Sequence, residues 1–225
     1  GSAQIIEDNL DKPAKIQTRL DRIKTVVQQG AGIVEAMLGF SRSSDHQTDQ
    51  CDVNGIVDDT LKLLGDRFVR EVEVHFERGV NLPEISVARD FVQQVLLNFI
   101  FNAADAMTER KRLILSTRLT KQLPDALALP PARAGWFIAI AVNDSGGGIT
   151  PENLPRIFEP FFTTKAMSAR RGTGLGLSMV YELAKKLNAG LAVETELGKG
   201  STFTVFLPAD SPTSPAGPVE KKTPP

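Results

Sequence analysis

The 225-residue chain has an apolar fraction of 41%, a charged fraction of 24% and a formal net charge of −1, which are ordinary values for a globular protein with a buried core. The near-zero charge gives no electrostatic reason to expect nucleic acid or an anionic membrane as the main partner. One Cys and two His exclude an internal disulfide scaffold and a zinc site built from Cys and His, and the apolar runs are too short for a membrane span.

The first segment of the chain has the pattern of a long helix. Ala14–Arg42 contains no Pro, and most of its apolar residues recur at steps of three, four or seven. Such a helix would be roughly 43 Å long at 1.5 Å per residue, which suits a dimerising helical hairpin; the alternative is one amphipathic helix lying on a globular domain. Ala3–Leu10 is expected to end another helix, with Asp11–Pro13 as the turn, so residues 1–45 are predicted to form a truncated helical hairpin.

The second segment mixes helices and strands. A polar stretch, Ser41–Cys51, marks the expected domain boundary, and Asp52 is a candidate N-cap. The predicted helices are Val53–Leu64, Ser86–Met107 and Leu175–Leu187, and the predicted strands are Val72–Glu77, Leu113–Leu119, Trp136–Val142, Leu191–Leu197 and Thr202–Leu207. The Pro-containing loop between the second and third of these strands is expected to run over the surface, and Pro208–Pro225 to form a disordered tail. Residues 52–207 are thus predicted to fold as an α+β domain, a two-layer α/β sandwich with a mixed sheet.

This domain contains three glycine-rich clusters, at Asp144–Gly148, Gly172–Gly176 and Gly198–Thr202. Glycine allows backbone to approach a ligand closely, and the second cluster directly precedes a helix, whose free N–H groups attract anions. A Walker A loop is excluded because Val193 stands where its first Gly would be, and a dinucleotide fingerprint is excluded because Leu177 stands where its last Gly would be. Each cluster alone is more typical of a turn, but the three together favour a phosphate site.

Polar residues also interrupt the apolar helix upstream. Asn98, Asn102 and Asp105 fall on one helical face among large apolar neighbours. Buried polar groups have to be paired or bound, and carboxamide oxygens suit Mg²⁺ whose coordination is completed by phosphate. The alternative is that these side chains face solvent or the helix end. Combined with the glycine clusters, the pattern favours a site for a metal ion and a nucleotide.

These segments resemble the sequence boxes of sensor histidine kinases, in family order and spacing. Asn98–Met107 is similar to the N box, Asp144–Ile149 to the G1 box and Ile157–Lys165 to the F box. Gly172–Leu177 resembles the G2 box and Gly198–Phe203 the last glycine box, while Met37–Arg42 looks like the end of the second dimerisation helix. The resemblance covers residues 52–207.

The resemblance implies a Bergerat ATP-binding fold with ATP and Mg²⁺ as cofactors. By this likeness Asn102 ligates Mg²⁺, Asn98 lies beside the phosphates, and Asp144 accepts a hydrogen bond from the adenine amino group. Ile149–Arg171 would form a mobile lid over ATP, anchored by Phe158 and Phe161. The complete set of expected nucleotide-binding residues is Asn98, Asn102, Asp105, Asp144, Gly146, Gly148, Ile149, Phe158, Thr164, Lys165, Arg171, Gly172, Thr173, Gly174, Leu175, Gly176, Leu177 and Thr202, with Arg170 as a further cation near the phosphates.

One position distinguishes branches of this superfamily. Gyrase and MutL relatives carry a Glu four residues before the metal-binding Asn, where it activates water, and this chain carries Asn98 there. Loss of that general base favours phosphoryl transfer over hydrolysis, so little ATPase turnover is expected.

A histidine kinase also needs a phospho-acceptor His, and neither His46 nor His75 lies in a matching context. In one explanation the chain begins downstream of the acceptor, and Gly1-Ser2, typical of a cloning remnant, favours this. In the other, Asp8–Pro13 is a degenerate acceptor box with Asp8 in the His position. The first explanation implies a fragment that holds the phosphoryl donor but does not phosphorylate itself.

The leading hypothesis is therefore the cytoplasmic, ATP-binding catalytic part of a two-component sensor kinase. Its expected partners are a second copy of the full-length protein and a response-regulator receiver domain, with no nucleic acid and no membrane contact in this fragment. One alternative is a non-catalytic nucleotide-binding dimerisation or scaffold module. The other is a Ser/Thr protein kinase of the same superfamily, and the helix end Phe40–Arg42 argues against this second alternative.

Overall fold

The computed structural model describes residues 48–108, 111–164 and 173–211. The chain divides into two units, residues 1–45 and 46–225, and the described residues all belong to the second. The predicted helical segment of residues 1–45 and residues 212–225 of the predicted tail lie outside the described residues.

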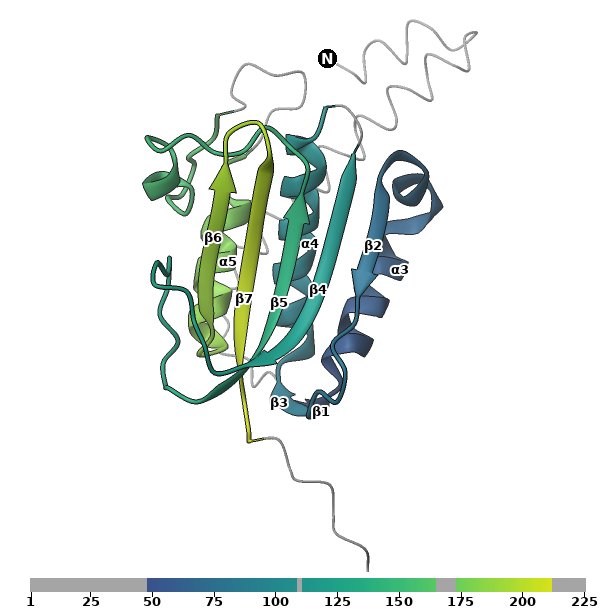
Figure 1. Cartoon of the computed structure of the whole chain (residues 1–225), viewed down its shortest axis with the longest axis vertical. Helices are drawn as coiled ribbons and strands as arrows, with labels where there is room; N and C mark the ends of the chain where they lie inside the picture. The colour runs from purple at the N-terminus through teal and green to yellow at the C-terminus, as the bar shows by residue number, and fades with distance from the viewer. Residues whose placement is uncertain (1–47, 109–110, 165–172, 212–225) are drawn as a thin grey trace, which may run out of the picture. The chain divides into compact units, whose positions relative to one another are not determined.

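The second unit alternates helices and strands along the chain (Figure 1). The elements are β1 (Asp49–Cys51), α3 (Val53–Glu71), β2 (Glu73–Glu77), β3 (Ile85–Val87), α4 (Arg89–Ala106), β4 (Arg112–Thr120), β5 (Trp136–Asp144), the 3₁₀ turn η1 (Leu154–Arg156), α5 (Gly176–Lys186), β6 (Gly190–Glu196) and β7 (Gly200–Ala209). None of the described helices is both long and apolar enough to cross a membrane.

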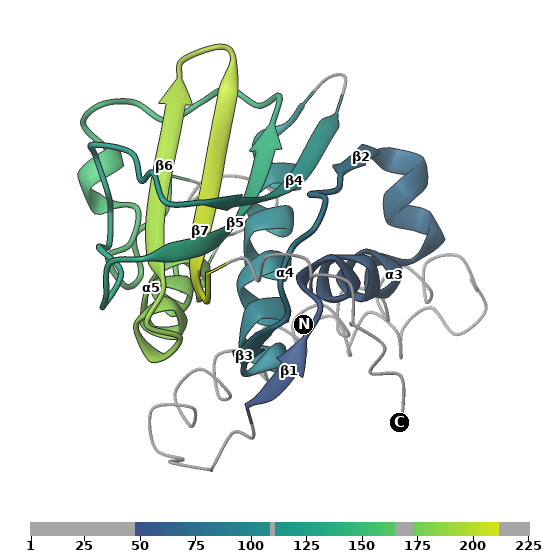
Figure 2. The ribbon, with the colours of Figure 1, turned by 60° about the horizontal axis from the view of Figure 1, so that its bottom comes forward.

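Five strands form the main sheet, in the order β2-β4-β5-β7-β6. β2 runs parallel to β4, and the other neighbours pair antiparallel, so the sheet is mixed. Helices α3, α4 and α5 all lie on one of its faces, as the tilted view in Figure 2 makes clear. The prediction of a two-layer α+β sandwich with a mixed sheet is therefore confirmed.

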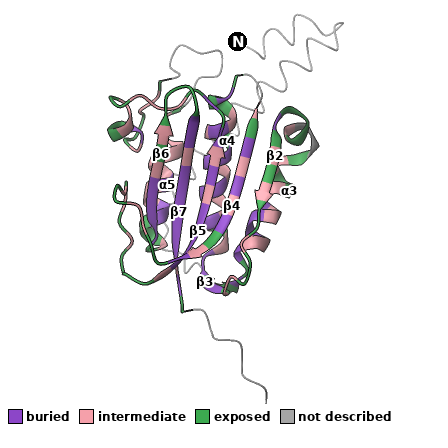
Figure 3. Ribbon diagram, in the orientation of Figure 1, coloured by how far each residue is buried: buried purple, intermediate pink, exposed green. Residues whose placement is uncertain are grey.

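The core lies between the sheet and these helices. Strand alternation sends Ile138, Ile140 and Val142 of β5 to this face, where they join the buried face of α4 in one apolar cluster. The ring centroids of Phe99 on α4 and Phe203 on β7 are 5.3 Å apart. Buried residues accordingly follow β5 and β7 in Figure 3, and this packing fixes which face of α4 turns toward the sheet.

The opposite face of the sheet is partly covered by the Pro-containing segment 121–135. Leu123 and Leu127 of this segment pack on a small cluster formed by Phe137, Ala139, Ala192 and Phe206. An isolated bridge between Leu129 and Leu191 ties the segment to β6. The predicted surface loop thus packs on the sheet face that the helices leave uncovered.

Several predicted boundaries differ from the structure. The N-cap prediction is confirmed, because the carboxylate of Asp52 accepts from the N–H groups of Asn54 and Gly55. The predicted helix over Ser86–Met107 is wrong at its start, where β3 pairs with the unpredicted β1 and the helix begins only at Arg89. The predicted tail is wrong at its first two residues, because β7 continues through Ala209 alongside β5.

Candidate functional site

The first glycine cluster begins at the end of β5 with a buried carboxylate. Asp144 is 2% exposed, and its Oδ1 accepts a hydrogen bond of 2.7 Å from the N–H of Gly146. A β-carbon on Gly146 would lie 2.8 Å from the carbonyl oxygen of Ala106 at the end of α4. Only glycine fits between this helix end and the carboxylate, so the cluster holds Asp144 rigidly against α4.

The first and third glycine clusters form one unit. Gly198 N–H donates to the Gly147 carbonyl at 3.0 Å, and a β-carbon on Gly148 (φ 73°) would collide with the carbonyl of Glu196. Gly200 (φ 113°) packs in the same way on the Asp144 carbonyl. The β6–β7 hairpin is therefore pressed directly onto the loop that follows β5.

The polar residues of this hairpin that lie near Asp144 are those whose side chains leave the sheet on the same face as Asp144. Asp144 pairs in register with Ser201, and Ser201 pairs with Thr195. Asp144 follows Val142 on the alternating pattern, so this row points to the helix-covered face. Thr202, predicted to support the nucleotide, is on the other face, where its Oγ1 accepts from Asn143 Nδ2 at 2.8 Å.

Thr202 therefore lies off the row that contains Asp144, and its role at the adenine end stays a prediction. Ser201 (5% exposed) and Thr195 were both missed. The signal that would have found Ser201 is the period of two along β7: Phe203, Val205 and Leu207 are the core-facing residues, and Ser201 continues their series.

The polar residues of α4 meet the start of α5. Asn98 Nδ2 donates to the Gln94 carbonyl at 2.8 Å, and a β-carbon on Gly176, the first residue of α5, would lie 2.9 Å from Asn98 Oδ1 and 3.8 Å from Asn102 Nδ2. Among the described residues, Asn102 Nδ2 is the buried side-chain polar atom that has no hydrogen-bond partner. Asp105, also predicted on this face, is exposed.

This arrangement has the donor set of a cation–phosphate site. The N-terminus of α5 presents free backbone N–H groups and the positive end of the helix dipole, and carboxamides face it from α4. No group of three His, Cys, Asp or Glu side chains able to hold a metal gathers within residues 48–108, 111–164 and 173–211. A hard cation here would be held by the amide oxygen of Asn102. The Nδ2 of the same amide, which has no partner among the described residues, needs an acceptor such as a phosphate oxygen.

The second glycine cluster is only partly described, and it touches the segment that follows the first cluster. Phe161 N–H donates to the Gly174 carbonyl at 2.9 Å, and a β-carbon on Gly174 (φ 68°) would collide with the Phe161 backbone. Thr173 and Thr164 are exposed, whereas Leu177 packs on the core. The predicted residues Lys165, Arg170, Arg171 and Gly172 lie outside the described residues.

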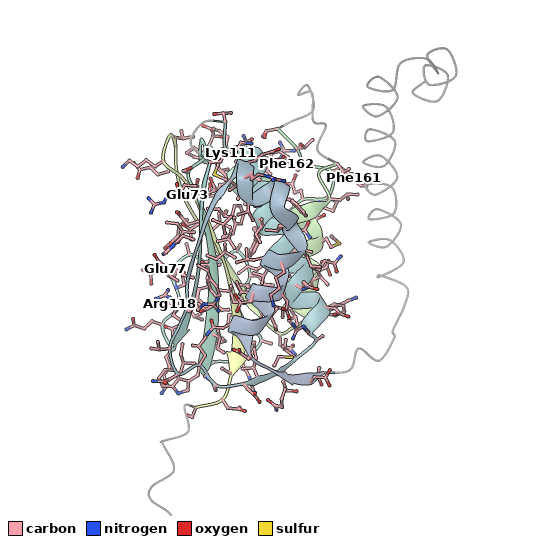
Figure 4. The ribbon with its side chains drawn as sticks, turned by 90° about the vertical axis from the view of Figure 1, so that its right-hand side faces the viewer. Glu73, Glu77, Lys111, Arg118, Phe161 and Phe162 are labelled. Atoms are coloured by element: carbon pink, nitrogen blue, oxygen red, sulfur yellow. The ribbon has the colours of Figure 1, made fainter. Side chains whose placement is uncertain are left out.

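One of the two aromatic residues predicted to anchor the lid packs on the core, and the other does not. Phe158 packs on the core and lies 5.7 Å from the ring of Tyr181, as predicted. Phe161 is 66% exposed with φ 66° and lies at the outer edge of the domain in Figure 4, so its prediction as an anchor is wrong. Phe162 packs on the core instead, with the Arg156 guanidinium 4.5 Å above its ring.

Glu152, at the start of this segment, has a lowered pKa because its own N–H and the Thr150 hydroxyl stabilise the carboxylate.

The comparison with protein families decides which fold family this site belongs to. Residues 87–211 match the family described as histidine kinase-, DNA gyrase B-, and HSP90-like ATPase. The chain belongs to this ATPase family. The matched residues include α4 with Asn98 and Asn102, all three glycine clusters and the β6–β7 hairpin.

Members of this ATPase family that resemble the chain include sensor kinases. Sensor kinase CckA of Brucella abortus is 35% identical over 193 residues, which are 83% of this chain and 20% of CckA. The chain thus spans about a fifth of the length of that relative. ShkA, solved in complex with AMPPNP, matches with a TM-score of 0.63 and 24% identity over 87% of this chain and 40% of that one. Histidine kinase ThkA, solved with response regulator protein TrrA, matches with a TM-score of 0.63 and 18% identity, and the match covers 93% of this chain and 56% of the ThkA chain. These two structures share the fold of this chain.

Proposed function

We propose that the chain is the ATP-binding catalytic part of a sensor histidine kinase, which binds Mg-ATP and transfers the γ-phosphoryl group to a histidine. The observation that carries this proposal is the meeting of Asn98 and Asn102 with Gly176 at the start of α5, on the same side of the sheet as the buried Asp144. A base-recognising carboxylate and an anion-binding helix end are the two halves of a nucleotide site. The names of relatives such as CckA support the kinase assignment.

Each end of the nucleotide has its own set of residues in this proposal. Asp144 accepts from the adenine amino group, and Gly146 and Gly148 let the base approach backbone closely. The phosphates lie at the N-terminus of α5, next to Asn98, where fixed N–H dipoles stabilise negative charge without reorganising. We assign the same end to Thr164, Thr173, Gly174, Leu175 and Leu177. The family resemblance alone assigns Lys165, Arg171 and Gly172 to it, since these residues lie outside the described residues.

Mg²⁺ would be held by the carboxamide oxygen of Asn102 and would supply charge neutralisation for the phosphates. The buried Nδ2 of the same amide has no partner among the described residues, and as a donor it would bind a phosphate oxygen of the nucleotide. A bound nucleotide would thus give this nitrogen the acceptor that the described residues do not supply, while the metal would take the amide oxygen.

Transfer is favoured over hydrolysis because no carboxylate occupies the Asn98 position. The Asn98 amide is held by the Gln94 carbonyl and does not abstract a proton from water, so a water molecule near the γ-phosphate would remain inactive. We expect the purified chain to release inorganic phosphate from ATP only slowly. Rapid phosphate release would contradict this part of the proposal.

The phosphoryl acceptor is a histidine other than the two present here. His75 is exposed on β2, on the strand farthest from β6 in the sheet, and His46 lies outside the described residues. We propose that the kinase acts in the cytoplasm as a dimer in its full-length form. We also propose that it passes the phosphoryl group to a response-regulator receiver domain, a partner of the kind seen with ThkA.

Two measurements test the proposed function. Calorimetric titration with ATP, with and without Mg²⁺, should show binding that Mg²⁺ strengthens, and absence of binding would overturn the proposal. A separately supplied helical fragment bearing the acceptor histidine should become phosphorylated from ATP. Nucleotide binding without such transfer would favour a non-catalytic module, and acid-stable phosphate on Ser or Thr would favour a Ser/Thr protein kinase.

A further inference from the structure

Three polar residues form a row across three neighbouring strands on the helix-covered face of the sheet. Asp144 of β5 pairs in register with Ser201 of β7, and Ser201 pairs with Thr195 of β6. The next row on the same face is Val142, Phe203 and Val193, and all three of these contribute to the apolar core. The polar row therefore ends the core at the edge where the first glycine cluster begins.

The hydroxyl of Thr195 contacts three residues at this edge of the core. Its Oγ1 accepts from the N–H of Ile149 at 2.9 Å and lies 3.2 Å from the carbonyl of Gly200, to which it is able to donate. The same atom lies 3.0 Å from Ser201 Oγ, with either oxygen able to donate. One side chain thus links the loop after β5 to the third glycine cluster, including Ser201, which pairs with Asp144.

A hydroxyl has one proton, so the contacts of Thr195 and Ser201 are coupled. When Thr195 donates to Gly200, Ser201 donates to Thr195 and presents only lone pairs to its surroundings. When Thr195 donates to Ser201, the proton of Ser201 is free to point elsewhere along the row. Thr195 therefore governs whether Ser201 offers a donor or an acceptor next to Asp144.

We propose that Thr195 is a positioning residue of the nucleobase subsite, acting through Ser201 and Ile149. This inference rests on the proposed ATP site. The edge of adenine presents an amino donor beside a ring-nitrogen acceptor, so recognition needs an acceptor beside a donor. Asp144 supplies the acceptor, and Ser201 supplies the donor when Thr195 donates to it. Thr195 also holds the glycine loop at Ile149 against the hairpin, which fixes the distance between the base and Asp144.

The test replaces the hydroxyl while keeping the shape of the side chain. Thr195→Val should lower ATP affinity by about tenfold, since it removes a coupled set of hydrogen bonds, and Thr195→Ser should stay within about twofold of wild type. Affinity for ITP, which has a carbonyl in place of the amino group, should change much less, so the ATP/ITP preference should fall. Thr204→Val, on the opposite face of β7 from Ser201, where Thr204 pairs with Ala141 and Ala192, is the matched control and should leave both affinities unchanged.

The outcomes separate a positioning role from a merely structural one. An equal loss for ATP and ITP, or a failure of Thr195→Ser to restore binding, overturns the proposal. If Thr195→Val does not fold, Ser201→Ala provides the second test, with a similar expected loss for ATP. Where both variants fold, the double variant should bind ATP about as well as either single one, and fully additive losses would contradict the coupling. Wild-type protein that binds no ATP would refute the proposed function itself, whereas wild-type binding with unaffected variants refutes only the role of Thr195.

Discussion

A β-carbon placed on Gly176 would lie 2.9 Å from Oδ1 of Asn98. The first residue of α5 thus closely approaches the polar face of α4. Because the atom that it would displace is the end of a side chain, Gly176→Ala should move the carboxamide while leaving the fold intact. We expect ATP affinity to fall about tenfold, with the free energy of unfolding changed by about 1 kcal/mol or less, since alanine is the better helix former. Calorimetry and urea denaturation measure the two quantities.

Gly55→Ala is the matched control for this variant. It adds the same methyl group to the first turn of another helix, α3, where the nearest atom would be Asp52 Oδ2 at 3.3 Å. ATP affinity should be unaffected. Unchanged affinity in Gly176→Ala as well would mean that no ligand group lies against Asn98.

Asn102 is predicted to give ATP binding its dependence on Mg²⁺. Asn102→Ala removes a carboxamide whose Nδ2 has no partner among the described residues, so little stability should be lost, about 1 kcal/mol at most. ATP affinity in Mg²⁺ should fall to the value that wild-type protein shows in EDTA. Titrations of both proteins in both buffers measure this. A variant whose ATP binding is still strengthened by Mg²⁺ to the wild-type degree would place the ion elsewhere.

Asp144 is predicted to select adenine through its negative charge. Asp144→Asn keeps the size of the buried side chain, but the neutral amide loses a charge-assisted hydrogen bond of about 1.5–3 kcal/mol, so ATP should bind roughly 10- to 100-fold more weakly. Asn143→Ala is the control, since Asn143 precedes Asp144 in the chain but bonds to Thr202 on the other face of the sheet. Competition binding with a fluorescent ATP analogue measures both, and equal effects of the two variants would argue against base recognition by Asp144.

The contrast between Ser201 and Thr202 shows what sequence patterns alone could resolve. The ordered boxes and the period of α4 were enough to predict a Bergerat sandwich and to place Asn98, Asn102 and Asp144 in one domain. Which residue of β7 faces Asp144 depends on register, and a shift of one residue exchanges the two faces. β1 and β3 were missed because each has three residues, too few for a periodic signal, and they pair between distant parts of the chain. The direction of Phe161 follows from a left-handed backbone that its residue type does not predict.

The two aromatic residues predicted as lid anchors should contribute very different amounts to stability. Phe158 packs on the core and against Tyr181, so Phe158→Ala should lower the free energy of unfolding by about 2–3 kcal/mol, less than a fully buried phenylalanine would lose. Phe161 is mostly exposed and has φ 66°, so Phe161→Gly should relieve backbone strain and change stability by less than about 1 kcal/mol. Urea denaturation measures both, and a larger loss in Phe161→Gly than in Phe158→Ala would contradict this packing.

Two glycines with similar backbone angles separate the cost of a left-handed conformation from the cost of a clash. Gly148 has φ 73° and Gly198 has φ 77°, but a β-carbon on Gly148 would collide with the Glu196 carbonyl, whereas one on Gly198 would meet nothing within 4 Å. Gly198→Ala should therefore cost only the conformational term, about 1–2 kcal/mol. Gly148→Ala should cost more, about 3 kcal/mol or above, because the hairpin has to move away from the loop. It should also weaken ATP binding, since that loop carries the base-recognising Asp144. Urea denaturation and calorimetry of the pair measure these differences, and equal losses of stability would mean that the hairpin is not pressed against the loop.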